Sequence, residues 1–267
     1  MKKHSILICL LCLLTVALSL PAAAMTEVTV RVRVEGAEET LYSGTVTCSQ
    51  DGKVSVYDVL VALDKTDNGI DIQGLEYGYI TAIGDQKAGC TAQGWDGFGI
   101  RVSGNYISYD RLKSTYVYGG ESLVIYYADE FGTGLLVPMV DTSEIHKGKL
   151  VFYAESEENG ATTVVPIKGA TVRWYCDEEF AQYVTDEFGC VTVHESFLTS
   201  GEHRISIHKQ NEEGIPAVLR MDPSYSVRVT TMVGDSPAIY ITAVLTVVSA
   251  LGLIVLLLTG KRRHNGV

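Results

Sequence analysis

Basic residues are scarce in this chain, and several of them sit at its two ends. The sequence has 21 Lys and Arg against 32 Asp and Glu, and five of the 21 are at positions 2, 3 and 261 to 263. All the acidic residues lie between these ends, which leaves 16 basic against 32 acidic residues there, a net charge of −16. A surface this acidic repels nucleic acid and anionic lipid, so we expect neither as a partner.

The motifs of catalysis are also missing. The sequence has no Gly-x-Ser-x-Gly, no His-Glu-x-x-His and no phosphate loop ending in Gly-Lys-Ser/Thr. The glycines around Phe98 open a predicted strand and not a helix, which excludes a dinucleotide site. Among the four cysteines at positions 48, 90, 176 and 190, no Cys-x-x-Cys or Cys/His pair has zinc spacing. We therefore expect no catalytic residues, no metal and no cofactor, and a protein that is not an enzyme.

Long apolar runs occur only near the two ends. Two lysines precede the run at 6–20, and three alanines at 22–24 form a signal peptidase site, so residues 1–24 are predicted to be a signal peptide. Residues 238–258 carry no charge and would make a helix of about 30 Å, the thickness of a bilayer core. The basic residues that follow predict a cytoplasmic end, so we expect a transmembrane helix at 238–260 and a cytoplasmic tail at 261–267.

The region between these runs is then extracellular, in a single-pass membrane protein. Four of the six cysteines lie there, two in each half. In an oxidising location, the economical pairing is Cys48 with Cys90 and Cys176 with Cys190. Free, buried thiols are the alternative.

The first half has a regular pattern of strands and one helix. Residues 28–34 alternate between valine and polar side chains, which predicts a half-buried strand, and a second strand is expected at 40–48. Ser55 stands three residues before Asp58 as a helix cap, and apolar residues recur at helical spacing up to Leu63. Several aromatic strands follow. This order predicts a β-grasp sheet, with the helix across one face and the other face open.

Five stretches of this half carry a family resemblance: VRVRVEG (30–36), SVYDVLVAL (55–63), YITAIGD (79–85), GWDGFGIRVSG (94–104) and YGGESLVIYYAD (118–129). They resemble a bacterial extracellular domain of unknown function that is similar to the C-terminal β-domain of transcobalamin and intrinsic factor. The resemblance assigns residues 25–130 to such a domain. It implies a bacterial source and a corrinoid, such as cobalamin, as the ligand.

Aromatic side chains are the candidate ligand contacts. Exposed Tyr and Trp offer a large contact area at small entropic cost, which suits a planar or sugar-like ligand. We select Trp95, Phe98, Tyr106 and Tyr109. The alternative for each of them is a place in the core.

The second half reads as short strands at regular intervals, with no helix. This spacing predicts a β-sandwich over residues 131–230, followed by a tether at 231–237. GATVRWYC (169–176), TDEFGCVTV (185–193) and SGEHRISI (200–207) resemble bacterial immunoglobulin-like or prealbumin-like surface modules. The four histidines of this half (146, 194, 203 and 208) are expected on the surface, because His203 and His208 have opposite parity on one strand and cannot share a metal.

Together these features predict a mainly β, membrane-anchored cell-surface binding protein with a corrinoid or another small ligand. The alternative is a non-catalytic stalk or adhesion protein whose partners are other surface proteins.

Overall fold

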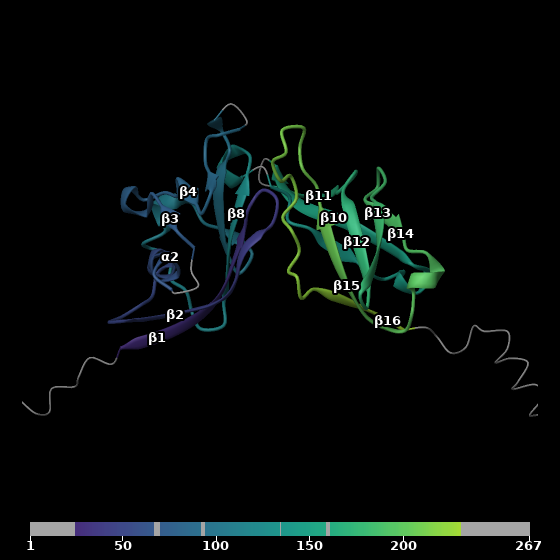
Figure 1. Cartoon of the computed structure of the whole chain (residues 1–267), viewed down its shortest axis with the longest axis horizontal. Coiled ribbons are helices and arrows are strands. Elements are labelled where there is room, and N and C mark those ends of the chain that lie inside the picture. The colour runs from purple at the N-terminus through teal and green to yellow at the C-terminus, as the bar shows by residue number, and fades with distance from the viewer. Residues whose placement is uncertain (1–24, 67–69, 92–93, 134, 159–160, 231–267) are drawn as a thin grey trace, which may run out of the picture. The chain divides into compact units, whose positions relative to one another are not determined.

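The computed structural model describes residues 25–66, 70–91, 94–133, 135–158 and 161–230 (Figure 1). The expected signal peptide, the expected transmembrane helix and the tail all lie outside these residues. Within the described ranges, no helix is long and apolar enough to cross a membrane. The described chain is mainly β, with a single α-helix and several sheets, so the predicted fold class is confirmed at this level.

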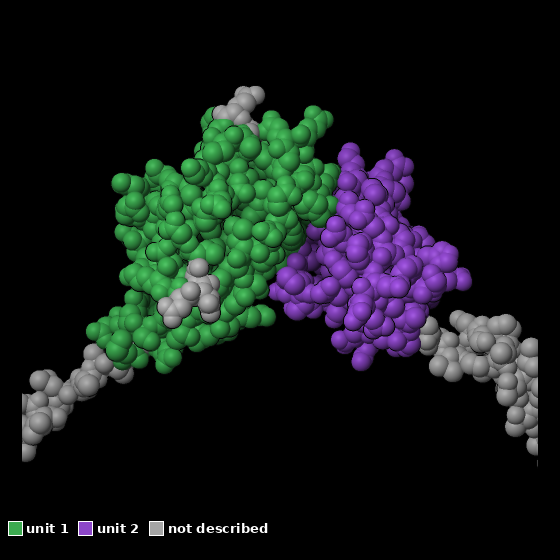
Figure 2. All heavy atoms as spheres, in the orientation of Figure 1, with its two compact units in different colours: residues 1–137, 208–220 green, residues 138–207, 221–267 purple. Residues whose placement is uncertain are grey.

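The chain forms two compact units, which are coloured separately in Figure 2. Unit 1 contains the chain up to Val137 and also His208–Arg220, which we call the return segment. Unit 2 contains the chain from Pro138 to Ile207 and from Met221 onward. The sequence placed the return segment in the second domain, because nothing in its local pattern indicates a pairing with the first half.

Unit 1 is built on a five-stranded sheet. Its strand order is β2 (Thr40–Gln50), β1 (Thr26–Glu35), β8 (Ser122–Ala128), β6 (Gly97–Val102) and β7 (Asn105–Tyr106). The strands β1 and β8 are parallel, and the other neighbours in this sheet are antiparallel. A small separate sheet joins β3 (Ile72–Gln73), β4 (Ala82–Ile83) and β5 (Gln86–Lys87). Single 3-10 turns lie at Leu75–Tyr77, Tyr109–Arg111 and Glu130–Gly132.

The only α-helix among the described residues, α2 (Val56–Asp64), covers one face of this sheet (Figure 1). Ser55 caps it as predicted: the Ser55 side chain accepts from the Asp58 amide, and the Asp58 carboxylate accepts from the Ser55 amide. The helix buries its apolar stripe against the sheet's inner face, which includes the four alternating valines of β1. The alternating valines therefore form the predicted strand, and the helix predicted after Ser55 is present.

The opposite face of the sheet is not open, contrary to expectation. Tyr126 and Ala128 of β8 are buried there under Leu135 and under Leu219 of the return segment. The backbone of Leu136 holds the return segment on both sides: its amide donates to Ala217, and its carbonyl accepts from Leu219. The chain itself thus covers the surface that was expected to be free.

A buried ion cluster fixes the end of the return segment. Glu35 at the end of β1 is buried, and its carboxylate lies 3.3 Å from the Arg33 guanidinium and 3.2 Å from that of Arg220. The Thr40 hydroxyl also donates to Glu35. Arg220 donates further to the carbonyl of Ala37, at 2.8 Å. This cluster satisfies a buried carboxylate and joins Arg220 to the turn between β1 and β2.

Unit 2 contains two four-stranded sheets. In one, β10 (Lys149–Glu158) pairs with β9 (Met139–Asp141), β11 (Ala161–Pro166) and β14 (Cys190–Thr192). The other has the order β13 (Glu179–Val184), β12 (Thr171–Cys176), β15 (Gly201–His208) and β16 (Ser226–Val229). Single 3-10 turns lie at Ile145–Lys147 and Glu195–Phe197.

Trp174 lies in the core of this unit. It is fully buried, and its indole N–H donates to the carbonyl of Phe197 at 2.9 Å. His203 stacks on it with ring centroids 4.8 Å apart and is itself buried. The expectation of a surface position was wrong for His203, because its ring nitrogens find backbone carbonyl partners at Thr199 and Tyr175 inside the unit.

The four cysteines of the described chain are free thiols, so neither expected disulfide is formed. Cys48 is buried on β2 with its thiol toward the Asp58 carbonyl, 3.8 Å away, whereas Cys90 is exposed. Burial, and secondarily the Asp58 charge, raises the pKa of the Cys48 thiol. Cys176 and Cys190 belong to strands of different sheets. The alternative of free, buried thiols holds in part, because all four thiols are free but only Cys48 is buried.

Candidate functional site

The four aromatic residues selected from the sequence divide into two pairs. Trp95 is 61% exposed and Tyr106 is 38% exposed. Phe98 is buried, and Tyr109 is largely buried beside it. Alternation along β6 explains the placement of Phe98, because Phe98, Ile100 and Val102 point toward α2.

Phe98 and Tyr109 belong to the core and not to a binding surface. The Phe98 ring packs edge-on against Tyr127, with centroids 5.5 Å apart. The Tyr109 hydroxyl donates to the Phe98 carbonyl at 2.6 Å. Burial raises the pKa of Tyr109 far above its usual range, so the phenol stays neutral. Phe98 is therefore closed to a ligand from solvent, and the half-buried Tyr109 supports β6 beside it.

Trp95 has an aromatic neighbour that the sequence did not suggest. Phe131 lies in the 3-10 turn after β8, is 46% exposed, and meets the Trp95 ring edge-on with centroids 5.9 Å apart. The Phe131 amide donates to the Trp95 carbonyl at 2.9 Å. The backbone therefore fixes both residues side by side while both rings remain accessible.

The turn that carries Phe131 has an unusual backbone. Glu130 and Phe131 have φ values of 49° and 52°, and Gly132 follows at 88°. A left-handed conformation costs about 1–2 kcal/mol per residue for side chains other than glycine. The turn lies close against β6, since a Cβ on Gly132 would stand 2.5 Å from the Gly99 Cα atom. Such strain persists only where the surroundings hold it, and it concentrates at functional sites.

Asp96 fixes the loop on the other side of Trp95. Its carboxylate is buried and accepts hydrogen bonds from the amides of Cys90 and Thr91, at 3.0 and 2.7 Å, and from the Tyr127 hydroxyl. Burial alone would raise the pKa of Asp96, but these donors outweigh it and lower the pKa overall. Burial, together with the Asp96 carboxylate, raises the pKa of Tyr127 to about 12. Asp96 is therefore ionised and Tyr127 neutral at physiological pH.

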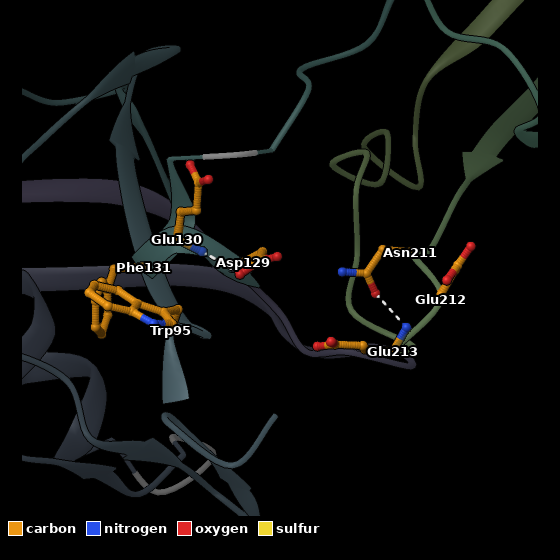
Figure 3. A pocket seen from close by; sticks show the side chains of 7 residues that line it. All are labelled: Trp95, Asp129, Glu130, Phe131, Asn211, Glu212 and Glu213. Carbon is orange, nitrogen blue, oxygen red and sulfur yellow. Dashed lines mark hydrogen bonds between the residues drawn. The ribbon is translucent and has the colours of Figure 1, made fainter. Parts of the chain in front are cut away.

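Trp95 and Phe131 line a surface hollow of about 740 Å³, all within unit 1 (Figure 3). Asp129 and Glu130 stand on the same wall, and the return segment supplies Asn211, Glu212 and Glu213 on the opposite one. Asn211 holds that wall in a tight turn, because its side-chain oxygen accepts from the amides of Glu213 and Ile215 at 3.0 and 2.9 Å. This size is typical of a small-molecule site.

The residues around the hollow give it a binding character. The described lining has neither histidine, cysteine, serine nor lysine, and its ionisable groups are the carboxylates of Asp129, Glu130, Glu212 and Glu213. No group of His, Cys, Asp and Glu among the described residues could hold a metal ion. The arrangement can bind an apolar or charged surface.

Tyr106 lies apart from this hollow, on the edge strand β7. The structure thus places one of the four selected residues, Trp95, at the hollow. Sequence reasoning missed Phe131 and the return segment. An aromatic residue next to glycine in the acidic turn 129–132 was the available signal for Phe131, and the distant return segment gave none.

Comparison with known protein families, with curated proteins and with solved structures yields no match for this chain.

Proposed function

We propose that this protein is a membrane-anchored cell-surface binding protein whose ligand site is the hollow at Trp95 and Phe131. The observation that carries the proposal is the exposed edge-on pair of these two rings. Large aromatic side chains held rigidly at the surface bind with little loss of conformational entropy. The strained turn that presents Phe131 supports the same reading, since strain at an exposed position has no evident benefit for folding.

The two units form, in this proposal, a β-grasp domain and an immunoglobulin-like sandwich. The order β2-β1-β8-β6 with parallel β1 and β8, and one helix on the inner face, supports the first. The two four-stranded sheets of unit 2 support the second. The apolar runs at 6–20 and 238–258 supply export and a membrane anchor.

A corrinoid is the first ligand to test, because the resemblance of residues 27–130 to the transcobalamin β-domain implies it. The outer sheet face is covered by Leu135 and Leu219, so a planar ligand cannot lie flat on β8. It would pack instead against the exposed Trp95 ring. The volume of the hollow supports partial enclosure of such a ligand, with correspondingly modest affinity.

Equilibrium dialysis of cobalamin against the full-length chain in non-ionic detergent tests this ligand. We expect saturable binding that is lost in Trp95→Ala and kept in Tyr118→Ala, a matched control that removes an equally exposed aromatic of unit 1 outside the hollow. Intrinsic fluorescence gives a second readout, because the other tryptophan of the chain, Trp174, is fully buried in unit 2. Absence of saturable binding up to millimolar cobalamin would exclude the corrinoid.

A stalk or protein-interaction platform is the second candidate. The burial of Phe98 and Tyr109, and the coverage of the outer sheet face by the return segment, both favour it. In that case Trp95→Ala leaves every ligand-binding measurement unchanged. The function of the protein is then to present unit 1 at the cell surface.

A further inference from the structure

The walls of the hollow carry charge of one sign. Asp129 and Glu130 stand on one side, and Glu212 and Glu213 on the other. None of the described residues that line it is basic. Glu130, Glu212 and Glu213 are exposed, and the Glu213 carboxylate points toward the opposite wall, whereas that of Glu212 points away from it (Figure 3).

The rings of Trp95 and Phe131 also favour a positively charged occupant. The face of an aromatic ring carries negative charge density, and a guanidinium or ammonium group within about 6 Å of the ring centroid is attracted to it. Tryptophan is the strongest partner of this kind, and Trp95 is 61% exposed. Unit 1 already uses this contact at its surface: the Lys113 ammonium lies 4.7 Å from the Tyr57 ring centroid. Rings and carboxylates therefore select the same charge on the occupant.

From this charge complementarity we propose that the hollow binds a basic peptide segment of a partner protein, with an arginine side chain over Trp95 and further basic side chains between the two acidic walls. The inference rests on the proposed function and names the chemistry of its ligand. A flat guanidinium can stack on an indole and donate to carboxylates at the same time, which an ammonium cannot.

A peptide fits the hollow better than a small organic cation does. Its volume of about 740 Å³ exceeds that of a single cationic group several times over. Carboxylates on two opposite walls are complementary to several positive charges held apart, which a basic peptide supplies. The net charge of −11 for the whole sequence also favours the approach of a basic partner over long distances.

Fluorescence titration of the full-length chain in non-ionic detergent tests the proposal with three probes: a hexa-arginine peptide, a hexa-lysine peptide and spermidine. We expect hexa-arginine to change the Trp95 emission saturably and to bind about tenfold more tightly than either other probe. Raising the salt from 50 to 300 mM should weaken its binding about tenfold, because the attraction is partly screened.

Two variants distinguish binding at the hollow from nonspecific attraction to the acidic surface. Isothermal titration calorimetry, which needs no tryptophan, should show about 30-fold weaker hexa-arginine binding to Trp95→Ala. The double variant E212Q/E213Q should lose about three- to tenfold. The matched control E76Q/D85N removes two exposed carboxylates of unit 1 outside the hollow and should bind like the native chain. Thermal unfolding of each variant verifies that it folds.

Three outcomes overturn the inference: no response to hexa-arginine, equal binding of spermidine, or equal losses in E212Q/E213Q and E76Q/D85N. Equal binding of spermidine would assign the hollow to small organic cations. If cobalamin binds in a Trp95-dependent manner while hexa-arginine does not, the proposed function stands and this inference fails. If neither ligand responds to Trp95→Ala, the proposed function fails with it.

Discussion

Phe131 is an exposed residue at which the backbone is conformationally strained. Two consecutive non-glycine residues, Glu130 and Phe131, take left-handed backbone conformations, and both side chains remain exposed. In contrast, the Phe98 ring occupies an ordinary inward position in the core. The chain therefore adds strain at the ring it exposes and none at the ring it buries.

Comparison of Phe131→Gly with Phe131→Ala isolates this strain. Both changes delete the ring, but glycine adopts a φ of 52° without penalty and alanine does not. We expect the glycine variant to have a free energy of unfolding about 1 kcal/mol higher than the alanine variant. Urea unfolding measures the difference. Equal stability of the two variants would show that the turn relaxes and stores no strain.

Asp96 makes unit 1 sensitive to acid. Its folded pKa is lowered, so its stabilising effect is complete above the unfolded pKa of about 3.9 and is lost as the pH falls through the folded value. Asp96→Asn should lower the free energy of unfolding by about 1–3 kcal/mol at pH 7, because three donors lose a carboxylate acceptor.

Urea titrations at pH 7 and pH 3 provide the measurement. The difference in free energy of unfolding between the native chain and Asp96→Asn should be smaller at pH 3 than at pH 7. The reason is that acid neutralises the same carboxylate that the substitution removes. Asp85→Asn, at an exposed position, is the control and should match the native chain at both values. A gap that stays constant with pH would contradict the role given to the Asp96 charge.

The return segment is the element that closes the outer face of the five-stranded sheet of unit 1. It covers the outer face of β8 through Leu219, and the ion cluster of Glu35, Arg33 and Arg220 holds its end. Removing Arg220 leaves the buried Glu35 carboxylate with Arg33 as its one remaining cation, which is more harmful than losing an exposed pair.

Arg220→Met should therefore lower the free energy of unfolding of unit 1 by about 2–4 kcal/mol. Arg228→Met is the matched control, because Arg228 meets Glu202 at 4.0 Å with both side chains mostly exposed, and it should have little effect. Amide hydrogen exchange in β1 and β8 measures this loss of stability in the strands next to the return segment. Similar protection in both variants would mean that the return segment is held by its apolar contacts alone.

How much of this could be read from the sequence depends on the range of the interactions. The valines of β1 and the cap at Ser55 are local patterns, and each forms the element that it predicts. Trp95 precedes β6, so strand alternation could not decide its exposure. The position of the return segment depends on the pairing of Leu136 with Val218. Most of unit 2 lies between these two residues in the sequence, and no local periodicity predicts a pairing at such a separation.

At the scale of the whole molecule, the proposal requires both units to lie outside the cell. Protease added to intact cells should digest the chain within residues 41–225 and leave a tag placed after Val267 intact. Cell fractionation should find the chain with membranes. Recovery in the cytosolic fraction, or a digested tag beside an intact ectodomain, would contradict the topology predicted from residues 238–258.

The path of the chain between the units has a mechanical consequence. Residues 138–207 leave unit 1 and come back to it, so the backbone path from unit 1 to the C-terminal side of the chain bypasses them. This path runs from Arg220 into β16, an edge strand whose one neighbour in its sheet is β15. In the proposed membrane-anchored topology, a pull on the C-terminal side would load the Glu35–Arg220 ion pair and the four-residue strand β16 before any other element.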